Sequence, residues 1–263
     1  MTVQGYWAEQ RATVFRDLPA DLVAVLPVGA IEQHGPHLPV SVDRDLVDAT
    51  VARCLSHLAA DQNVLFLPTL GITKSGEHDR HPGTLSLTAD TLLATLRDIG
   101  ASISLAGVER LAFLNGHGGN TAVLEVAARD LRISHDMIVA TGSWFGFADF
   151  ERVIDSEALD SDIHAGDSET SAMLAARPEL VDTSRMQNFV SANREWEREN
   201  RFIGLAGQPA RPAWIIDDLN SDGACGDASA ATAEKGRHLL DTAARNFALF
   251  LAEFARFDPR RHS

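Results

Sequence analysis

Cysteine and aromatic residues are both scarce in this chain. Only two cysteines occur among 263 residues, Cys54 and Cys225, and they form no CxxC pair. Two such distant cysteines are too few for a disulfide framework, which indicates a reducing compartment. Aromatic residues make up 6% of the chain and hydrophobic residues 45%, so aliphatic side chains must fill most of the core.

Basic residues are in the minority, and long apolar runs are missing. The 23 Lys and Arg residues stand against 37 Asp and Glu residues, which gives a formal charge of −14. This charge argues against binding to nucleic acid or to an anionic membrane, because both require a basic surface. No apolar run approaches the ~18 residues of a membrane span, and residues 1–22 show no secretory signal. We therefore expect a cytoplasmic protein.

Short apolar runs alternate along the chain with segments that have helical spacing. This alternation predicts an α/β fold whose central sheet is mostly parallel and covered by helices on both faces. No internal repeat or linker is visible, so residues 1–263 are predicted to form a single domain. The predicted strands are 23–28, 64–68, 110–115 and 137–145, and the predicted helices are 46–60, 90–105, 121–132 and 229–256.

Weaker signals predict several smaller features. Asp90 and Asn120 are candidate N-caps of the helices that follow them. A further helix is expected to follow residue 164 and to end before Pro178. A short helix is expected within residues 1–20 and a strand at 213–216, and the remainder of 146–163 and 183–227 reads as irregular.

The stretch from 23 to 45 combines a buried strand with an unusual density of metal-binding side chains. The apolar run 23–28 is followed within a few residues by acidic and imidazole groups. Ligands of open α/β sheets bind just past the carboxyl ends of strands, so this position suggests a site. An ordinary solvated loop is the alternative interpretation. The side chains concerned are Glu32, His34, His37, Asp43 and Asp45.

Two later strand-to-helix loops carry ligand-type residues as well. His117 follows the strand 110–115, and His164 and Glu169 follow the strand 137–145. In a parallel sheet these loops open at the same edge, so their side chains can converge with those of the first loop. A mixture of imidazoles and carboxylates suits Zn²⁺, Mn²⁺ or Fe²⁺ better than Mg²⁺. We therefore expect a metal site, in which His164 acts as general acid or base.

Each of these loops also has a simpler interpretation. Glycines between a strand and a helix, as in the segment 115–120, can cradle a phosphate, but the segment matches neither GxGxxG nor a Walker loop. We instead expect Gly118 and Gly119 to allow backbone and substrate to approach His117 closely. Glu169 would also be favourable simply as an acidic residue in the first turn of a helix.

The long loop 71–83 and the end of the fourth strand supply candidate substrate contacts. Ser75, Glu77 and His78 could contact substrate, could support the ligands, or could lie at the surface. Trp144 could form a wall of a pocket or pack in the core, which is the usual place for a tryptophan.

Taken together, these motifs resemble those of the creatininase (creatinine amidohydrolase) family. The matching segments occur in the expected order between residues 25 and 240. The combination is specific, although no single motif would be. The segments are EQHGPHLP followed by Asp43, SGEHDRHPGTLSL, NGHGGN, HAGDSETS and GDASAATAEKG.

The resemblance implies a three-layer α/β/α fold and a metal-dependent hydrolase of non-peptide C–N bonds. It also implies two divalent metal ions per subunit, Zn or Mn with Fe as a further possibility, and a homohexamer. By motif, Glu32, His34 and Asp43 would be ligands, with Asp43 as the bridge between the metals. His117 would be a further ligand, and His164 would be the catalytic histidine.

One position departs from the family pattern. Creatininases proper carry NGHFEN, in which the Glu is a metal ligand, whereas this chain has Gly119 there. The missing ligand must come from elsewhere, and Glu169 is the candidate. Members with NGHGGN are similar to deformylases of formylamino-pyrimidines and to a peptide-trimming enzyme of redox-cofactor maturation. The glycine therefore argues against creatinine as the substrate.

The leading hypothesis from the sequence is an amidohydrolase that uses a metal-activated water. It would attack the carbonyl of a small cyclic amide, lactam or formamide, and His164 would protonate the leaving nitrogen. A deformylase or small-peptide hydrolase on the same site is the alternative within enzymes. A non-catalytic metal-binding scaffold and a nucleotide-binding protein are the alternatives from other classes.

Overall fold

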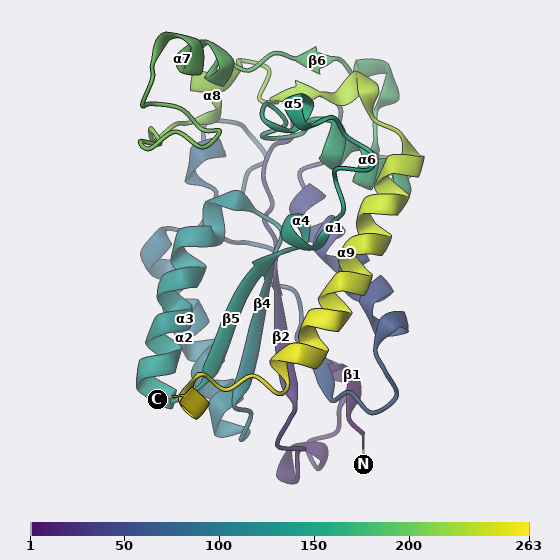
Figure 1. The fold of residues 1–263 in the computed structure, drawn as a ribbon, viewed down its shortest axis with the longest axis vertical. Helices are drawn as coiled ribbons and strands as arrows, with labels where there is room; N and C mark the ends of the chain where they lie inside the picture. Colours follow the sequence, from purple (N-terminus) through teal and green to yellow (C-terminus); the bar gives the residue numbers. More distant parts are fainter. Residues whose placement is uncertain (1, 263) are drawn as a thin grey trace.

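Five parallel strands form the central sheet of this computed structural model, which describes residues 2–262. Their spatial order is β1-β3-β2-β4-β5 (Figure 1). The inner strands are buried along their whole length, as expected for a parallel sheet that is covered on both faces. The strands are β1 (Gln4–Tyr6), β2 (Val23–Val28), β3 (Val64–Phe66), β4 (Arg110–Asn115) and β5 (Ile138–Ser143).

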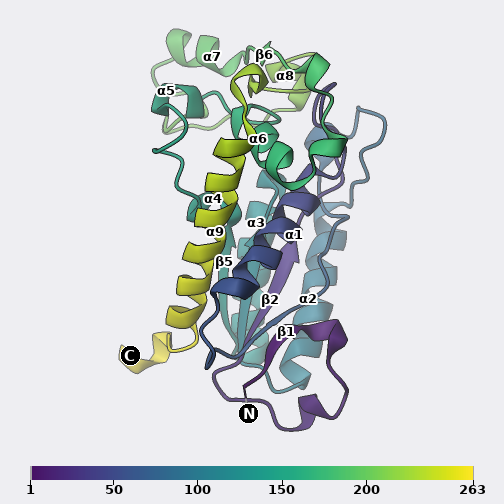
Figure 2. The same ribbon diagram turned by 90° about the vertical axis from the view of Figure 1, so that its right-hand side faces the viewer.

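Helices cover both faces of the sheet, which confirms the predicted three layers. α2 (Ala89–Leu105) and α3 (Thr121–His135) pack against one face, to the left of the sheet in Figure 1. α1 (Val42–Cys54), α6 (Asp167–Ala176) and α9 (Ala233–Phe254) cover the other face, and Figure 2 shows α1 and α9 side by side. Alternate residues of β2 accordingly enter two different cores.

Shorter elements lie above the carboxyl edge of the sheet, in the upper part of Figure 1. β6 (Asn188–Phe189) and β7 (Gly226–Asp227) form a small antiparallel pair that the sequence did not reveal. The short helices are α4 (Trp144–Phe147), α5 (Ser156–Leu159), α7 (Asn193–Glu199) and α8 (Ile216–Leu219). Within residues 2–262, no helix combines the length and apolar character that crossing a membrane would require.

The order of the strands places a crevice at the end of β2. The chain runs from β2 to β3, which pairs with one edge of β2, and later crosses to β4, which pairs with the other edge of β2. The connections that leave β2 and β4 therefore diverge at this edge of the sheet. Such a switch point is where open α/β sheets bind their ligands.

Three local predictions were wrong. α1 begins at Val42, so Asp43 and Asp45 lie in the first turn of a helix, where carboxylates are favourable, and not in a loop. Thr88, not Asp90, caps α2, because its Oγ1 accepts a hydrogen bond from the Thr91 amide. The segment 213–216 is irregular up to the start of α8 and forms no strand. The short helix expected within residues 1–20 is present as two 3-10 helices, and the edge strand β1 precedes them.

Asn120 stands at the start of α3, as predicted, but its side chain makes no cap. It instead donates a hydrogen bond of 3.0 Å to the carbonyl of Gly29. This bond ties the loop after β4 to the loop after β2.

Candidate metal centre

Five side chains from separate segments meet at the carboxyl edge of the sheet. The loop after β2 supplies two of them, the first turn of α1 one, the loop after β4 one and the first turn of α6 one. All five are at most 7% exposed, although they are spread over 138 positions of sequence. They are Glu32, His34, Asp43, His117 and Glu169, the residues predicted as metal ligands.

The cluster divides into two groups that share Asp43. Glu32, Asp43 and His117 form one group, and His34, Asp43 and Glu169 form the other. The two oxygens of Asp43 point to different groups, because Oδ1 lies 3.3 Å from His34 Nε2 and Oδ2 lies 3.3 Å from His117 Nδ1. A carboxylate in this position can bridge two cations.

The outer nitrogens of both histidines are held by backbone carbonyls. His34 Nδ1 donates to the carbonyl of Glu32 at 3.0 Å, and His117 Nε2 donates to the carbonyl of Lys74 at 3.0 Å. Each neutral ring therefore turns its lone pair toward the carboxylates, as the outer hydrogen bonds of metal-binding histidines usually require. Three buried atoms at the centre have no hydrogen-bond partner: Glu32 Oε1, His34 Nε2 and Asp43 Oδ2. The donor set fits a pair of divalent cations.

The electrostatics of the cluster favour added positive charge. Burial opposes ionisation of Glu32, but the charge and hydrogen bond of His117, together with the charge of His78, lower the pKa of Glu32 to about 2. Burial also opposes the charge on His34, but the carboxylates of Asp43 and Glu169 raise its pKa to about 10. Burial raises the pKa of Glu169 itself to about 7, against the attraction of His34. Bound cations would displace the protons that His34 and Glu169 hold.

His164 lies beside both groups of ligands. Its ring nitrogens lie close to Glu32 and to His34. Glu32 and His34 belong to different ones of the two groups that share Asp43. His164 Nε2 donates to the carbonyl of Gln33 at 2.8 Å, so the lone pair of the neutral ring is on Nδ1, 3.6 Å from Glu32 Oε1. Burial, together with the nearby His34 and His78, holds the pKa of His164 well below its usual value. The ring is therefore able to accept a proton at Nδ1.

A cavity of about 1020 Å³ opens onto the cluster. The predicted substrate contacts Glu77, His78, Gly118 and Gly119 line it. Ser75 does not line it, because this fully buried residue donates its hydroxyl hydrogen bond to Glu32 Oε2. Ser75 therefore holds the carboxylate of Glu32 and does not face the cavity.

Trp144 is in the core and not in the cavity wall. Its side chain is fully buried and stacks on Phe145, with the ring centroids 4.1 Å apart. Phe145 and Trp214 are the aromatic residues that line the cavity instead. Sequence reasoning missed Trp214 because it lies in the irregular segment 183–227. This segment has no regular spacing of apolar residues from which a buried or cavity-lining side chain could be predicted.

Gly119 makes room for Glu77. A Cβ at Gly119 would lie 1.9 Å from Glu77 Oε1 and 2.4 Å from His117 Nε2. Glu77 Oε2 in turn pairs with the ammonium group of Lys74 at 2.5 Å. The absence of a side chain at position 119 thus allows a carboxylate from the 71–83 loop to lie next to His117.

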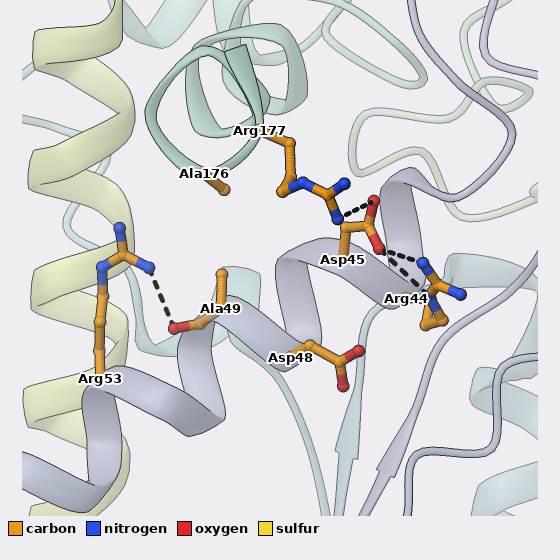
Figure 3. Close-up of a pocket in the computed structure, with 7 residues that line it drawn as sticks. All are labelled: Arg44, Asp45, Asp48, Ala49, Arg53, Ala176 and Arg177. Atoms are coloured by element: carbon orange, nitrogen blue, oxygen red, sulfur yellow. Dashed lines mark hydrogen bonds and ion pairs between the residues drawn. The ribbon is translucent and has the colours of Figure 1, made fainter. Parts of the chain in front are cut away.

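The other two polar residues of the first loop region do not join the cluster. His37 Nε2 is 2.8 Å from Thr170 Oγ1, next to Glu169 in α6, so it supports that helix. Asp45 faces a separate cavity of about 330 Å³ between α1 and α6 (Figure 3). There it pairs with Arg44 at 2.6 Å and with Arg177 at 3.7 Å.

Comparison with known proteins agrees with this geometry. The family model described as creatinine amidohydrolase (Creatininase) matches residues 8–251. The chain is 32% identical over 258 residues to a creatinine amidohydrolase of Pseudomonas putida, covering 92% of each chain. It is 31% identical over 222 residues to a mycofactocin precursor peptide peptidase of Mycobacterium tuberculosis, covering 82% of this chain and 79% of the relative.

Solved structures extend the similarity to the fold. A mutant creatininase described as the Zn-Zn type has a TM-score of 0.72 and 28% identity, covering 95% of this chain and 98% of its own. A creatininase structure described as the Mn form has a TM-score of 0.72 and 27% identity, covering 97% and 99%.

Proposed function

This chain belongs to the creatininase family, and we propose that it is a metal-dependent amidohydrolase that cleaves a C–N amide bond of a small molecule. The observation that carries this proposal is the position of Asp43 between two groups of buried ligands. A stable core rarely contains three neighbouring buried carboxylates, two of which have an oxygen without a hydrogen-bond partner, unless cations neutralise them.

We propose that the cluster holds two divalent ions, zinc or manganese, with iron as a further possibility. The Zn-Zn and Mn forms of related creatininases support these metals. Glu32 and His117 would hold one ion and His34 and Glu169 the other, with Asp43 shared between them. Two such ions would supply a water acidic enough to attack at neutral pH, and would polarise the substrate carbonyl.

His164 is the group that moves the proton. Its Nδ1 takes a proton from the attacking water while the water oxygen bonds to the carbonyl carbon. The C–N bond then breaks, and the same proton passes from Nδ1 to the leaving nitrogen, which yields a carboxylic acid and an amine. The hydrogen bond from Nε2 to the carbonyl of Gln33 keeps the ring in the orientation and protonation state that this transfer requires.

Hydrolysis of a formamide or of a small peptide on the same site is the second candidate. The relative from Mycobacterium tuberculosis is named a peptide peptidase, which favours the peptide. The cavity of about 1020 Å³ is also larger than a single small ring requires, since pockets of ~300–1,000 Å³ accept drug-sized ligands.

A hydrolysis screen tests the proposal. Cyclic amides, formamides and short peptides would be incubated with the protein after chelation and again after addition of Mn²⁺ or Zn²⁺. We expect turnover of one of these classes only with metal present. Glu32→Gln should lose metal and activity together, whereas Glu125→Gln, an exposed change on α3, should keep both.

Two outcomes would contradict the proposal. Metal binding without hydrolysis of any amide would favour a non-catalytic metal-binding scaffold. Full metal occupancy in the Glu32→Gln variant would show that the ligands are assigned incorrectly.

We also propose a homohexamer, by resemblance to the family. Sedimentation velocity of the purified protein checks this state, and a species of the 28.4 kDa monomer alone would contradict it.

A further inference from the structure

Four histidines surround the candidate metal centre, and in three of them the inward nitrogen carries the lone pair. His34, His117 and His164 each donate their outer N–H to a backbone carbonyl. A carbonyl oxygen can only accept, so the proton of each neutral ring is fixed on the outer nitrogen. These three rings therefore present acceptors to the centre.

His78 is the exception, because its outer nitrogen faces a side-chain amide. His78 Nδ1 lies 2.9 Å from Gln33 Nε2, and both residues are buried. Whether this nitrogen accepts or donates depends on which end of the Gln33 amide points toward it.

Two backbone groups fix the orientation of the Gln33 amide. The amide N–H of Gly35 donates to Gln33 Oε1 at 2.9 Å, and the carbonyl of Gly223 accepts from Gln33 Nε2 at 2.9 Å. If the two ends of the amide were exchanged, Gln33 Nε2 would face the N–H of Gly35, donor against donor, and Gln33 Oε1 would face the carbonyl of Gly223, acceptor against acceptor. Gly223 also packs so closely that a Cβ there would lie 2.3 Å from Gln33 Oε1, which leaves the side chain little freedom.

The amide nitrogen of Gln33 must therefore donate to His78 Nδ1. Its two hydrogens are used by His78 and by the carbonyl of Gly223, and none remains for His164 Nε2, which donates to the Gln33 carbonyl instead. A neutral His78 ring then carries its proton on Nε2, which lies 3.5 Å from Glu32 Oε1. His78 lines the cavity, so it presents a donor where the other histidines present acceptors.

We propose that Gln33 is a positioning residue that gives two neighbouring histidines opposite roles. Its backbone carbonyl fixes His164 as a proton acceptor, and its side-chain amide fixes His78 as a hydrogen-bond donor. The two rings are close, with centroids 4.3 Å apart. This inference rests on the proposed hydrolysis. While His164 takes the proton of water, His78 donates to the oxygen that becomes negative as the carbonyl is attacked, without transferring its own proton.

Nitrogen-15 NMR of the histidine rings tests the assignment without substrate. The full-length protein, loaded with diamagnetic Zn²⁺ at pH 8, would carry ¹⁵N-labelled histidine, and the variants His78→Gln and His164→Gln would assign the signals. We expect the proton on Nε2 in both rings, with Nδ1 as the bare nitrogen. A proton on Nδ1 of either ring would overturn the proposal.

Gln33→Glu tests the dependence on the amide. A carboxylate cannot donate to His78 Nδ1, so the ring should become protonated at Nδ1, and kcat should fall about 100-fold, the usual effect of losing one oxyanion donor. Zinc content and KM should change little. Retention of the wild-type ring signals or of full kcat in the folded variant would contradict the role of Gln33.

Gln62→Glu is the matched control. Gln62 also accepts from a backbone amide, that of Ala59, and donates to a backbone carbonyl, that of Ala248, but it lies away from the centre. The Gln62→Glu variant should leave the signals of the His78 and His164 rings and kcat unchanged. If Gln33→Glu does not fold, the wild-type spectrum alone decides the proposal. If no amide is hydrolysed, the proposed function fails while the spectrum still tests the protonation of both rings.

Discussion

At the scale of single residues, the lack of a side chain at Gly119 explains the arrangement around His117. Gly119 itself offers no ligand atom, and Glu169 of α6 lies with His34 and Asp43. The space beside His117 is not left open, because Glu77 fills it. The carboxylate of Glu77 therefore lies 3.6 Å from His117 Nε2.

Gly119→Ala should weaken metal binding. The new Cβ would collide with Glu77 and with His117 Nε2, and it would disturb the hydrogen bond of that nitrogen to the carbonyl of Lys74. Loss of such an outer contact usually costs ~10–100-fold in metal affinity. Gly118→Ala is the control, since a Cβ at that position meets nothing within 4 Å. Competition with a chelator measures both affinities, and equal values would contradict the account.

His37 should make stability fall in mild acid. Burial and the nearby His34 lower its pKa from 6.5 to about 4. Between pH 6.5 and 4 the unfolded chain therefore binds a proton at this residue that the folded protein does not bind, so the free energy of unfolding decreases as the pH falls. Above pH 6.5 neither state is protonated there and the effect is absent.

Thermal unfolding of the chelated protein across this range checks the effect. His37→Gln should give a shallower dependence of Tm on pH, whereas the exposed change His57→Gln should follow the wild type. An unchanged slope in His37→Gln would show that another group causes the loss.

The five candidate ligands predicted from the sequence lie together in the structure, and their role as ligands stays a prediction, whereas the residues that support them were not predicted. The ligands are chemically distinctive side chains in recognisable motifs. The role of Gln33 depends on its hydrogen bond to the carbonyl of Gly223, and the role of Trp214 depends on the other residues that line the cavity. These neighbours come from distant segments of the chain. No pattern along the chain contains that information.

At the scale of elements, the position of Glu169 depends on how α6 packs. The first turn of α6 is polar and yet buried, and Lys235 of α9 pairs with Asp167 in that turn at 2.5 Å. α9 approaches closely because Gly236 has no side chain, and a Cβ there would lie 1.8 Å from the carbonyl oxygen of Ser171.

Gly236→Ala should destabilise the protein despite better helix propensity. Alanine gains about 1 kcal/mol in a helix interior, but forcing a methyl group into packed backbone costs about 1–3 kcal/mol. We expect a lower Tm and weaker metal binding through displaced Glu169. Gly146→Ala in α4, where a Cβ meets nothing within 4 Å, should keep both. Stabilisation by Gly236→Ala would contradict the close packing of α6 and α9.

The boundaries of elements were predicted less well than their existence. Apolar periodicity marks the middle of α1, but its first turn carries Asp43 and Asp45, which look like loop residues in the sequence. Tertiary contacts support that turn: Asp43 lies 3.3 Å from His34, and Asp45 lies 3.7 Å from Arg177. The predicted strand at 213–216 failed because a short apolar run cannot show whether a partner strand is present.

At the scale of the whole molecule, the topology explains why distant motifs form one site. The chain leaves β2 in one direction and returns to place β4 on its other side, so the loops that follow both strands open into the same crevice. Alternation of strands and helices predicted this sheet. Only the structure shows how α6, which follows a long irregular segment, brings Glu169 into the crevice.

The central claim is that Asp43 joins two metal sites, and that Glu169 completes the one from which the family glutamate is missing. Elemental analysis of the purified chain and of Glu169→Gln after reconstitution with Zn²⁺ tests this most directly. The account predicts two metals per chain in the wild type and one in the variant. No metal in the wild type, or two in Glu169→Gln, would contradict it.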